Sequence, residues 1–157
     1  MMRIAVLSAL VASLAACAHS GPSLDTAQRL EIYRAHAGPP VASFQINRVA
    51  GVTRWTPLGD QALAIWNTPA QGYLLEFRAR CAGLSIASSI TISNSMGMVN
   101  ARLDSVQPRA ANGSAILQPC RISSARPLDG RALSEAKREF RQASVIDRPE
   151  GVVPEEE

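Results

Sequence analysis

Residues that catalytic and metal sites usually need are scarce in this sequence. Its 157 residues include two histidines and three cysteines. His19 falls in a short polar stretch near the N-terminus, which leaves His36 for a folded site. The chain has no H-E-x-x-H motif, no G-x-S-x-G elbow, no phosphate loop and no dinucleotide fingerprint. We therefore expect no metal, no cofactor and no catalytic residue, although a pair of carboxylates would still allow glycoside hydrolysis.

Aromatic residues and lysine are also rare. Aromatic side chains make up 4% of the chain and hydrophobic residues 46%, so the core must be mainly aliphatic. Among the 16 basic residues Lys137 is the only lysine, and the others are arginines. A GC-rich coding bias explains this preference, and the alternative is an arginine surface that grips carboxylates or phosphates. The net charge of +3 is too small to indicate a nucleic-acid partner.

The N-terminus has the pattern of a bacterial lipoprotein signal. A short basic start precedes an apolar run over residues 4–16, which suits a signal peptide and is too short to span a membrane. The run ends in the lipobox L-A-A-C, whose cysteine is Cys17. We predict a signal peptide over residues 1–16, followed by a lipidated cysteine and a tether over residues 17–23. An ordinary signal peptide with an incidental cysteine is the alternative.

The lipid anchor determines the expected compartment. Acyl chains such as palmitate on Cys17 would hold the protein at a membrane, since two chains already anchor a protein stably. Ala18 replaces the aspartate that retains lipoproteins in the inner membrane, which favours the outer membrane facing the periplasm. In that oxidising compartment we predict a disulfide between Cys81 and Cys120. A redox or metal pair is the alternative, but the C-x-x-C spacing is missing.

Hydrophobic periodicity predicts one α+β domain over residues 24–143. A helix is expected over residues 24–37, with Asp25 and Gln28 in a capping-box arrangement, and a second helix after Gly130. The strand patterns between them lie at residues 43–52, 54–58, 61–67, 73–78, 84–93, 98–107 and 116–126. Six or seven strands without strand–helix alternation predict an antiparallel, barrel-like curled sheet flanked by the two helices. Residues 144–157 are polar, and we expect a disordered tail there.

Three aromatic residues are candidates for a binding surface. Trp55, Trp66 and Tyr73 fall on consecutive strand patterns, and Asp60 lies between the first two. Together these four residues would form a platform for a glycan or a peptide. The alternative is that the three aromatic side chains are core anchors, which is their commoner role.

Asp60 is also a candidate for acid/base chemistry. Glu76 or Asp104 would be its partner in a pair of carboxylates. We favour a structural role, because Gly-Asp is typical of a tight turn in which aspartate bonds its own backbone. His36 is likewise expected to be structural, at the end of the first helix, where the helix dipole stabilises an imidazolium.

Several stretches of the mature chain resemble an uncharacterised family of short bacterial lipoproteins, a domain of unknown function. The stretches are Y-R-A-H-A-G at residues 33–38, W-T-P-L-G-D at 55–60, and C-R-I at 120–122 with R-P-L-D at 126–129. The similarity covers about residues 30–140. The resemblance implies a fold and an envelope location, and it implies no known activity.

These observations point to a lipid-anchored periplasmic protein without catalysis. We expect a binding or interaction module of the bacterial envelope, attached to the membrane by its anchor, with an envelope protein or a glycan as partner and no nucleic acid. One alternative is an envelope hydrolase that uses paired carboxylates such as Asp60 and Glu76. Another is a protein inhibitor of a hydrolase.

Overall fold

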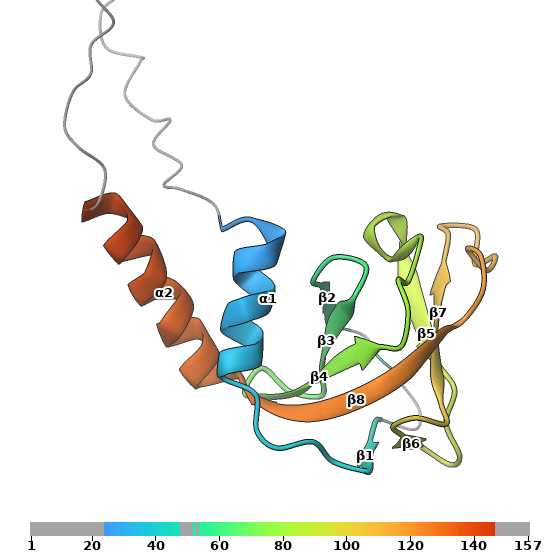
Figure 1. The fold of residues 1–157 in the computed structure, drawn as a ribbon. Helices are drawn as coiled ribbons and strands as arrows, with labels where there is room; N and C mark the ends of the chain where they lie inside the picture. The colour runs from blue at the N-terminus through green and yellow to red at the C-terminus, as the bar shows by residue number, and fades with distance from the viewer. Residues whose placement is uncertain (1–23, 48–51, 53, 147–157) are drawn as a thin grey trace, which may run out of the picture.

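Two helices lie side by side at one end of the molecule, and strands form the rest (Figure 1). The computed structural model describes residues 24–47, 52 and 54–146. The elements found in this part of the chain are α1 Thr26–Ala35, β1 Ser43–Gln45, β2 Arg54–Pro57, β3 Ala62–Trp66, β4 Gln71–Phe77, a 3-10 helix Leu84–Ile86, β5 Ser89–Ile92, β6 Met98–Asn100, β7 Ser105–Arg109, β8 Cys120–Asp129 and α2 Gly130–Ile146. The fold is α+β, as predicted. The predicted signal peptide, Cys17, the tether and residues 147–157 lie outside the described residues.

Helix α1 begins with the predicted capping box. The carboxylate of Asp25 accepts a hydrogen bond from the Gln28 backbone N–H at 2.8 Å, and the Gln28 side chain accepts one from the Asp25 N–H at 3.1 Å. These two bonds satisfy donors that a helix N-terminus leaves free. Beyond the helix, the guanidinium of Arg126 donates to the carbonyls of Ala37 and Gly38, both at 2.8 Å. Strand β8 therefore holds the chain where it leaves α1.

The main sheet has six strands in the order β2-β3-β4-β8-β7-β5, and all pairings are antiparallel. Antiparallel partners that lie opposite each other share a face. Trp55, Ile65 and Tyr73 form one such row, whereas Trp66 pairs with Gly72 on the opposite face. Because both faces are covered, β3 and β4 are buried on both sides and show little alternation.

Two hydrophobic clusters fill the two sides of the sheet. The cluster on the side of the disulfide includes Leu63, Ile65, Leu75, Val99, Val106 and Ile122. The cluster on the helical side includes Leu30, Tyr33, Leu58, Leu74, Leu128 and Leu133. Most members are aliphatic, as the scarcity of aromatic residues predicts.

Strand β8 is long and curved, and it runs from the helices to the far end of the sheet (Figure 1). On one side it pairs with β4, and on the other it pairs with β7 only at residues 120–121. Ile122 N also donates to Asp104 O at 3.1 Å, and farther along the second side bonds to residues 37–41, through Gly38 N to Pro127 O at 2.9 Å and Val41 N to Ala125 O at 2.8 Å. The chain then enters the separate pair of strands β1 and β6. The strands of the described residues do not close into a barrel.

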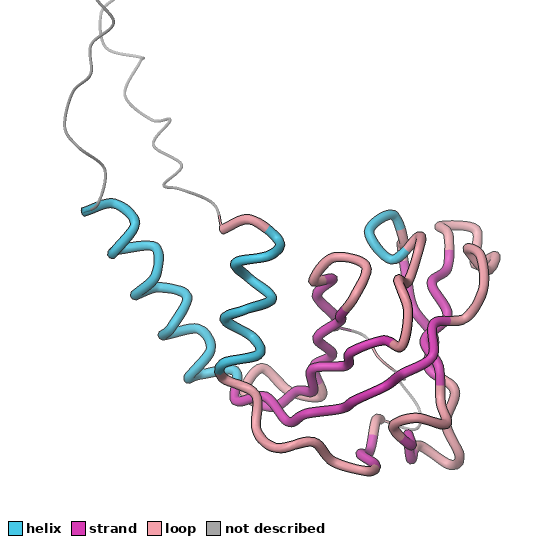
Figure 2. Tube along the Cα trace, viewed as in Figure 1, coloured by secondary structure: helices cyan, strands magenta, loops and turns pink. Residues whose placement is uncertain are grey.

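The bounds of several predicted strands differ from those of the structure, and two of the predicted strands are not single strands. The pattern over residues 84–93 contains a 3-10 helix followed by the short strand β5 (Figure 2). The pattern over residues 98–107 contains two strands, β6 and β7, with a turn between them. Arg102 in that turn has φ +77°, a conformation that a continuous strand excludes.

Asp104 follows this turn and directly precedes β7, so it is not part of a strand as the pattern over residues 98–107 predicts. Its carboxylate accepts hydrogen bonds from the Ser93 hydroxyl at 2.6 Å and the Asn100 N–H at 2.7 Å. These bonds hold the end of β5 against the turn between β6 and β7.

Helix α2 packs on the sheet and on α1 through its first half. Leu133 is 1% exposed in the helical-side cluster. The amine of Lys137 donates to the Tyr33 hydroxyl at 2.7 Å and lies 4.2 Å from the centre of the Tyr33 ring. The helix continues to Ile146, so it extends three residues past the predicted domain end at 143.

Candidate anion-binding cleft

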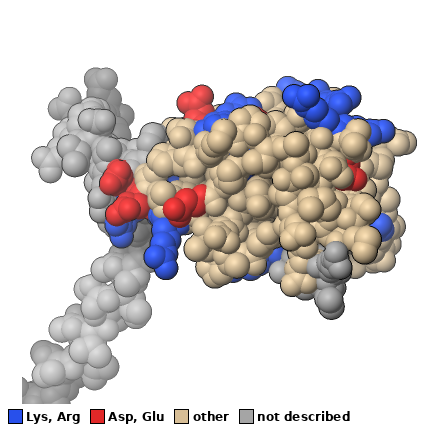
Figure 3. Space-filling model, turned by 90° about the horizontal axis from the view of Figure 1, so that it is seen from below, with Lys and Arg blue, Asp and Glu red and all other residues tan. Residues whose placement is uncertain are grey.

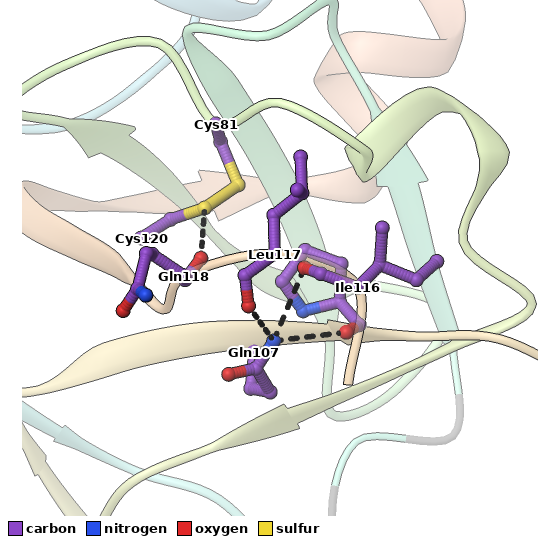
Figure 4. Close-up of a disulfide and its surroundings, with 7 residues drawn as sticks. Cys81, Gln107, Ile116, Leu117, Gln118 and Cys120 are labelled. Atoms are coloured by element: carbon purple, nitrogen blue, oxygen red, sulfur yellow. Dashed lines mark hydrogen bonds between the residues drawn. A yellow bond between two sulfur atoms is a disulfide. The ribbon is translucent and has the colours of Figure 1, made fainter. Parts of the chain in front are cut away.

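Cys81 and Cys120 form a disulfide in the structure, as predicted from the sequence. The bond connects the segment that follows β4 to the first residue of β8, and both cysteines are buried. Figure 4 shows the neighbouring loop over residues 110–119 held by Gln107, whose amide donates to the carbonyls of Ile116 at 3.3 Å and Leu117 at 3.4 Å. The disulfide thus holds the segment after β4 against β8, and Gln107 holds the loop before β8 against β7.

The four residues of the predicted binding surface do not form one surface. Trp55 and Tyr73 lie on the disulfide side of the sheet, where the Tyr73 ring stacks on Phe44 with centroids 4.4 Å apart. Trp66 lies on the helical side, 6.4 Å from the Tyr33 ring centre in an edge-to-face arrangement. All three aromatic residues are half-buried against the core.

Asp60 occupies the turn between β2 and β3. Gly59 before it has φ +81°, which suits glycine in such a turn. The carbonyl of Asp60 accepts a hydrogen bond from the Cys81 N–H at 2.6 Å, and its carboxylate lies 3.5 Å from the Arg80 guanidinium. Asp60 thus binds the chain segment next to the disulfide, through both its backbone and its side chain.

Glu76 is also paired with an arginine. Its carboxylate lies 2.9 Å from Nε of Arg34, which comes from α1. Asp60 and Glu76 each have a different guanidinium partner, Arg80 and Arg34. The structure thus places both carboxylates as partners of arginines.

A cleft of about 390 Å³ opens between these two ion pairs. It is lined by Arg34, Gln61, Glu76, Phe77, Arg78, Ala79, Arg80 and Ser123. The lining residues come from α1, the residue before β3, the end of β4 with the segment that follows it, and the middle of β8. Its volume lies within the range of small-molecule sites, roughly 300–1,000 Å³. Three guanidinium groups in one hollow give it the chemistry of an anion site.

A β-bulge forms one wall of the cleft. The register between β4 and β8 shifts at Glu76 and Phe77, so that Phe77 pairs with Ile122. The Ser123 hydroxyl donates to the carbonyl of Glu76 at 3.0 Å. After the bulge the chain leaves β4, which turns Arg78 and Arg80 towards the hollow.

Arg78 belongs to a second group of arginines beyond the cleft. Its guanidinium donates to the carbonyl of Arg102 at 3.2 Å, and that of Arg121 donates to the carbonyl of Leu103 at 2.9 Å. Figure 3 shows basic side chains gathered at the end of the molecule away from the helices, beside a wide uncharged face. No carboxylate of the described residues lies within 4 Å of these two guanidinium groups.

Comparison with known proteins identifies the family of this chain. The model of DUF6491, a family of unknown function, matches residues 1–144. The chain belongs to this family. No curated protein and no solved structure matches it.

Sequence reasoning missed one catalytic pattern in this DUF6491 chain. Ser134 and Lys137 on α2 have the S-x-x-K spacing in which lysine activates a serine nucleophile. The Lys137 amine is bonded to the Tyr33 hydroxyl, and no described hydrogen bond joins it to Ser134. Ser134 lines a second hollow, of about 430 Å³, at the start of α2. The spacing is present, but the hydrogen bond between nucleophile and base that the chemistry requires is missing.

His36, the one histidine available to a folded site, has a structural role. His36 is the C-cap of α1, and its Nδ1 lies 2.9 Å from the Ile32 carbonyl. The described residues contain no cluster of three or more His, Cys, Asp or Glu side chains arranged for a metal. Their helices are too short or too polar to cross a membrane.

Proposed function

We propose that this DUF6491 protein is a lipid-anchored binding module of the bacterial envelope, without catalysis, on the outer membrane facing the periplasm. The observation that supports a binding role most is the cleft with Arg34, Arg78 and Arg80, because it combines ligand size with a set of guanidinium donors. The partner would be an envelope protein or a glycan.

The anchor part of the proposal depends on Cys17 and the lipobox. Cys17→Ser should give unprocessed or soluble protein that no longer partitions into detergent. Cys120→Ser is the matched control, because it removes a cysteine that is used in the disulfide, and it should leave the partitioning unchanged. A wild-type protein that is soluble and without lipid would refute the anchor.

We also propose that the sheet curls into a barrel-like scaffold. Its support is the backbone of residues 37–42, which bonds to β8 at Ala125 and Pro127 and to Ala101 beside β6. Through these bonds the curl of the sheet continues from β8 towards the β1–β6 pair.

The hydrolase alternative requires Asp60 and Glu76 to act as a pair of carboxylates. Their separate ion pairs with Arg80 and Arg34 favour a positioning role for both. Incubation of the purified protein with peptidoglycan and with chromogenic glycosides tests this point. Turnover that Asp60→Asn abolishes would refute the non-catalytic proposal.

One observation favours the inhibitor alternative. Leu117 is 66% exposed and has φ +56°, in a loop that is held by Gln107 and that ends at the disulfide-bonded Cys120. A strained apolar residue on a pre-organised loop is a feature of protein recognition sites. Capture of a hydrolase from envelope extract by the wild-type protein, but not by Leu117→Ser, would support this function.

A further inference from the structure

We propose that the Arg34–Arg78–Arg80 cleft binds a carboxylate or phosphate group of its ligand, held mainly by Arg78 and Arg80. This inference rests on the proposed binding function and names the chemical class of the ligand. Carboxylate and phosphate groups are both anionic, and each has two or more oxygens that accept hydrogen bonds from a planar guanidinium fork.

The Arg78 guanidinium lines the cleft and has donors to spare. It has five N–H groups, and the described residues use one of them, from Nη2 to the Arg102 carbonyl at 3.2 Å. Its side chain has no carboxylate within 4 Å in the described part of the chain. The bond to the Arg102 carbonyl holds the side chain in place at the wall of the cleft.

Arg80 is weakly held and can exchange its partner. Its distance to the Asp60 carboxylate is 3.5 Å, and its side chain is 80% exposed. An exposed pair at this distance contributes little, about 0–1 kcal/mol. An incoming carboxylate or phosphate can therefore bind Arg80 at small cost.

Arg34 has a different role in the cleft. Its Nε lies 2.9 Å from Glu76, whose side chain is 24% exposed. This shorter and less exposed pair fixes the α1 wall of the cleft. The charge of Arg34 is balanced by Glu76, while Arg78 and Arg80 provide the free donors.

The segment that bears Arg78 and Arg80 is fixed at both ends. The Arg78 N–H donates to the Arg121 carbonyl at 3.0 Å, and Cys81 is bound to Asp60 and to Cys120. A segment fixed in this way loses little conformational freedom when a ligand binds, which favours affinity.

The test is isothermal titration of the purified full chain with citrate as the carboxylate probe and pyrophosphate as the phosphate probe. We expect at least one probe to bind with one site per chain, and the stronger probe indicates which anion the cleft prefers. Arg78→Gln and Arg80→Gln should each weaken that binding about tenfold or more.

Arg131→Gln is the matched control, because it removes the same charge from an exposed arginine at the start of α2. It should change the affinity less than twofold. Arg78→Lys keeps the charge but loses the fork, and it should bind more weakly than the wild type while melting at the same temperature. Failure of both probes to bind, or equal losses in Arg78→Gln and Arg131→Gln, would overturn the proposal. Lipid anchoring and capture of an envelope partner test the wider function independently of this result.

Discussion

At the scale of single residues, Asp60 shows how one side chain serves the turn and the cleft together. Its carbonyl binds Cys81 and its carboxylate faces Arg80, so the turn after β2 positions the arginine segment. From the sequence, Asp60 could be either a turn residue or a catalytic acid. The structure supports the turn residue, because the Gly59-Asp60 turn lies against a segment about 20 residues further along the chain.

Removing the charge of Asp60 gives a prediction with a definite sign. Asp60→Asn keeps the turn and a polar side chain but releases Arg80 from its carboxylate. Because the cleft becomes more positive, affinity for citrate or pyrophosphate should rise about two- to fivefold in the titration. A loss of affinity would show that Asp60 contacts the ligand directly, and would contradict the role of Asp60 as a partner of Arg80 alone.

The single lysine of the chain gives a second prediction at this scale. Lys137→Met retains the aliphatic stem but loses the bond to the Tyr33 hydroxyl and the contact with its ring. The free energy of unfolding, measured in urea, should fall by about 1–2 kcal/mol. Arg138→Met, in an exposed ion pair at 3.8 Å, is the control and should cost much less. Equal effects of the two variants would show that the contacts of Lys137 with Tyr33 do not stabilise the fold.

At the scale of the elements, local signals in the sequence predicted more than long periodicities did. The capping box of Asp25 and Gln28 and the turn at Gly59-Asp60 depend on neighbouring residues, and both are present in the structure. The pattern over residues 98–107 failed because alternation continues through a turn in which Arg102, a residue other than glycine, adopts a positive φ. The aromatic platform is not present, because the spacing of the residues does not predict which face of the sheet each side chain occupies. Trp66 lies opposite Gly72 on the helical side.

The disulfide gives the prediction that belongs to this scale. It joins the segment after β4 to β8 across 39 residues, a loop whose closure contributes on the order of 4 kcal/mol. Cys81→Ser, Cys120→Ser and the double variant should lower the melting temperature by similar amounts without changing the proposed lipid anchor. Non-reducing mass spectrometry of a tryptic digest should show the two cysteine peptides joined. Two free thiols in protein folded under oxidising conditions would contradict the structure.

At the scale of the whole molecule, the cleft is a product of tertiary assembly. Arg34, Glu76 and Ser123 come from α1, β4 and β8, and the sequence contains no motif that links them. Its general preference for arginine was visible in the composition, where coding bias explains it equally well. The position of the cleft depends on the β-bulge at Glu76 and Phe77, and bulges have no reliable sequence signal when glycine is not involved.

The arrangement separates the proposed anchor from the proposed site. The tether would precede α1 at its N-terminal end, while Arg34 lies in the last turn of that helix. The cleft is therefore at the opposite end of α1 from the point where the described chain begins. A ligand in the envelope would reach the cleft without passing the tether.

The central claim is that the arginine cleft is the recognition site in the cell envelope, and site-specific photo-crosslinking in intact cells tests it most directly. A photoreactive residue replaces Ala79, which is exposed between Arg78 and Arg80, and Ala132, exposed on α2, is the matched position. We predict a defined adduct from position 79 that Arg78→Gln diminishes strongly, and no such adduct from position 132. No adduct from position 79, or the same adducts from both positions, would contradict the claim.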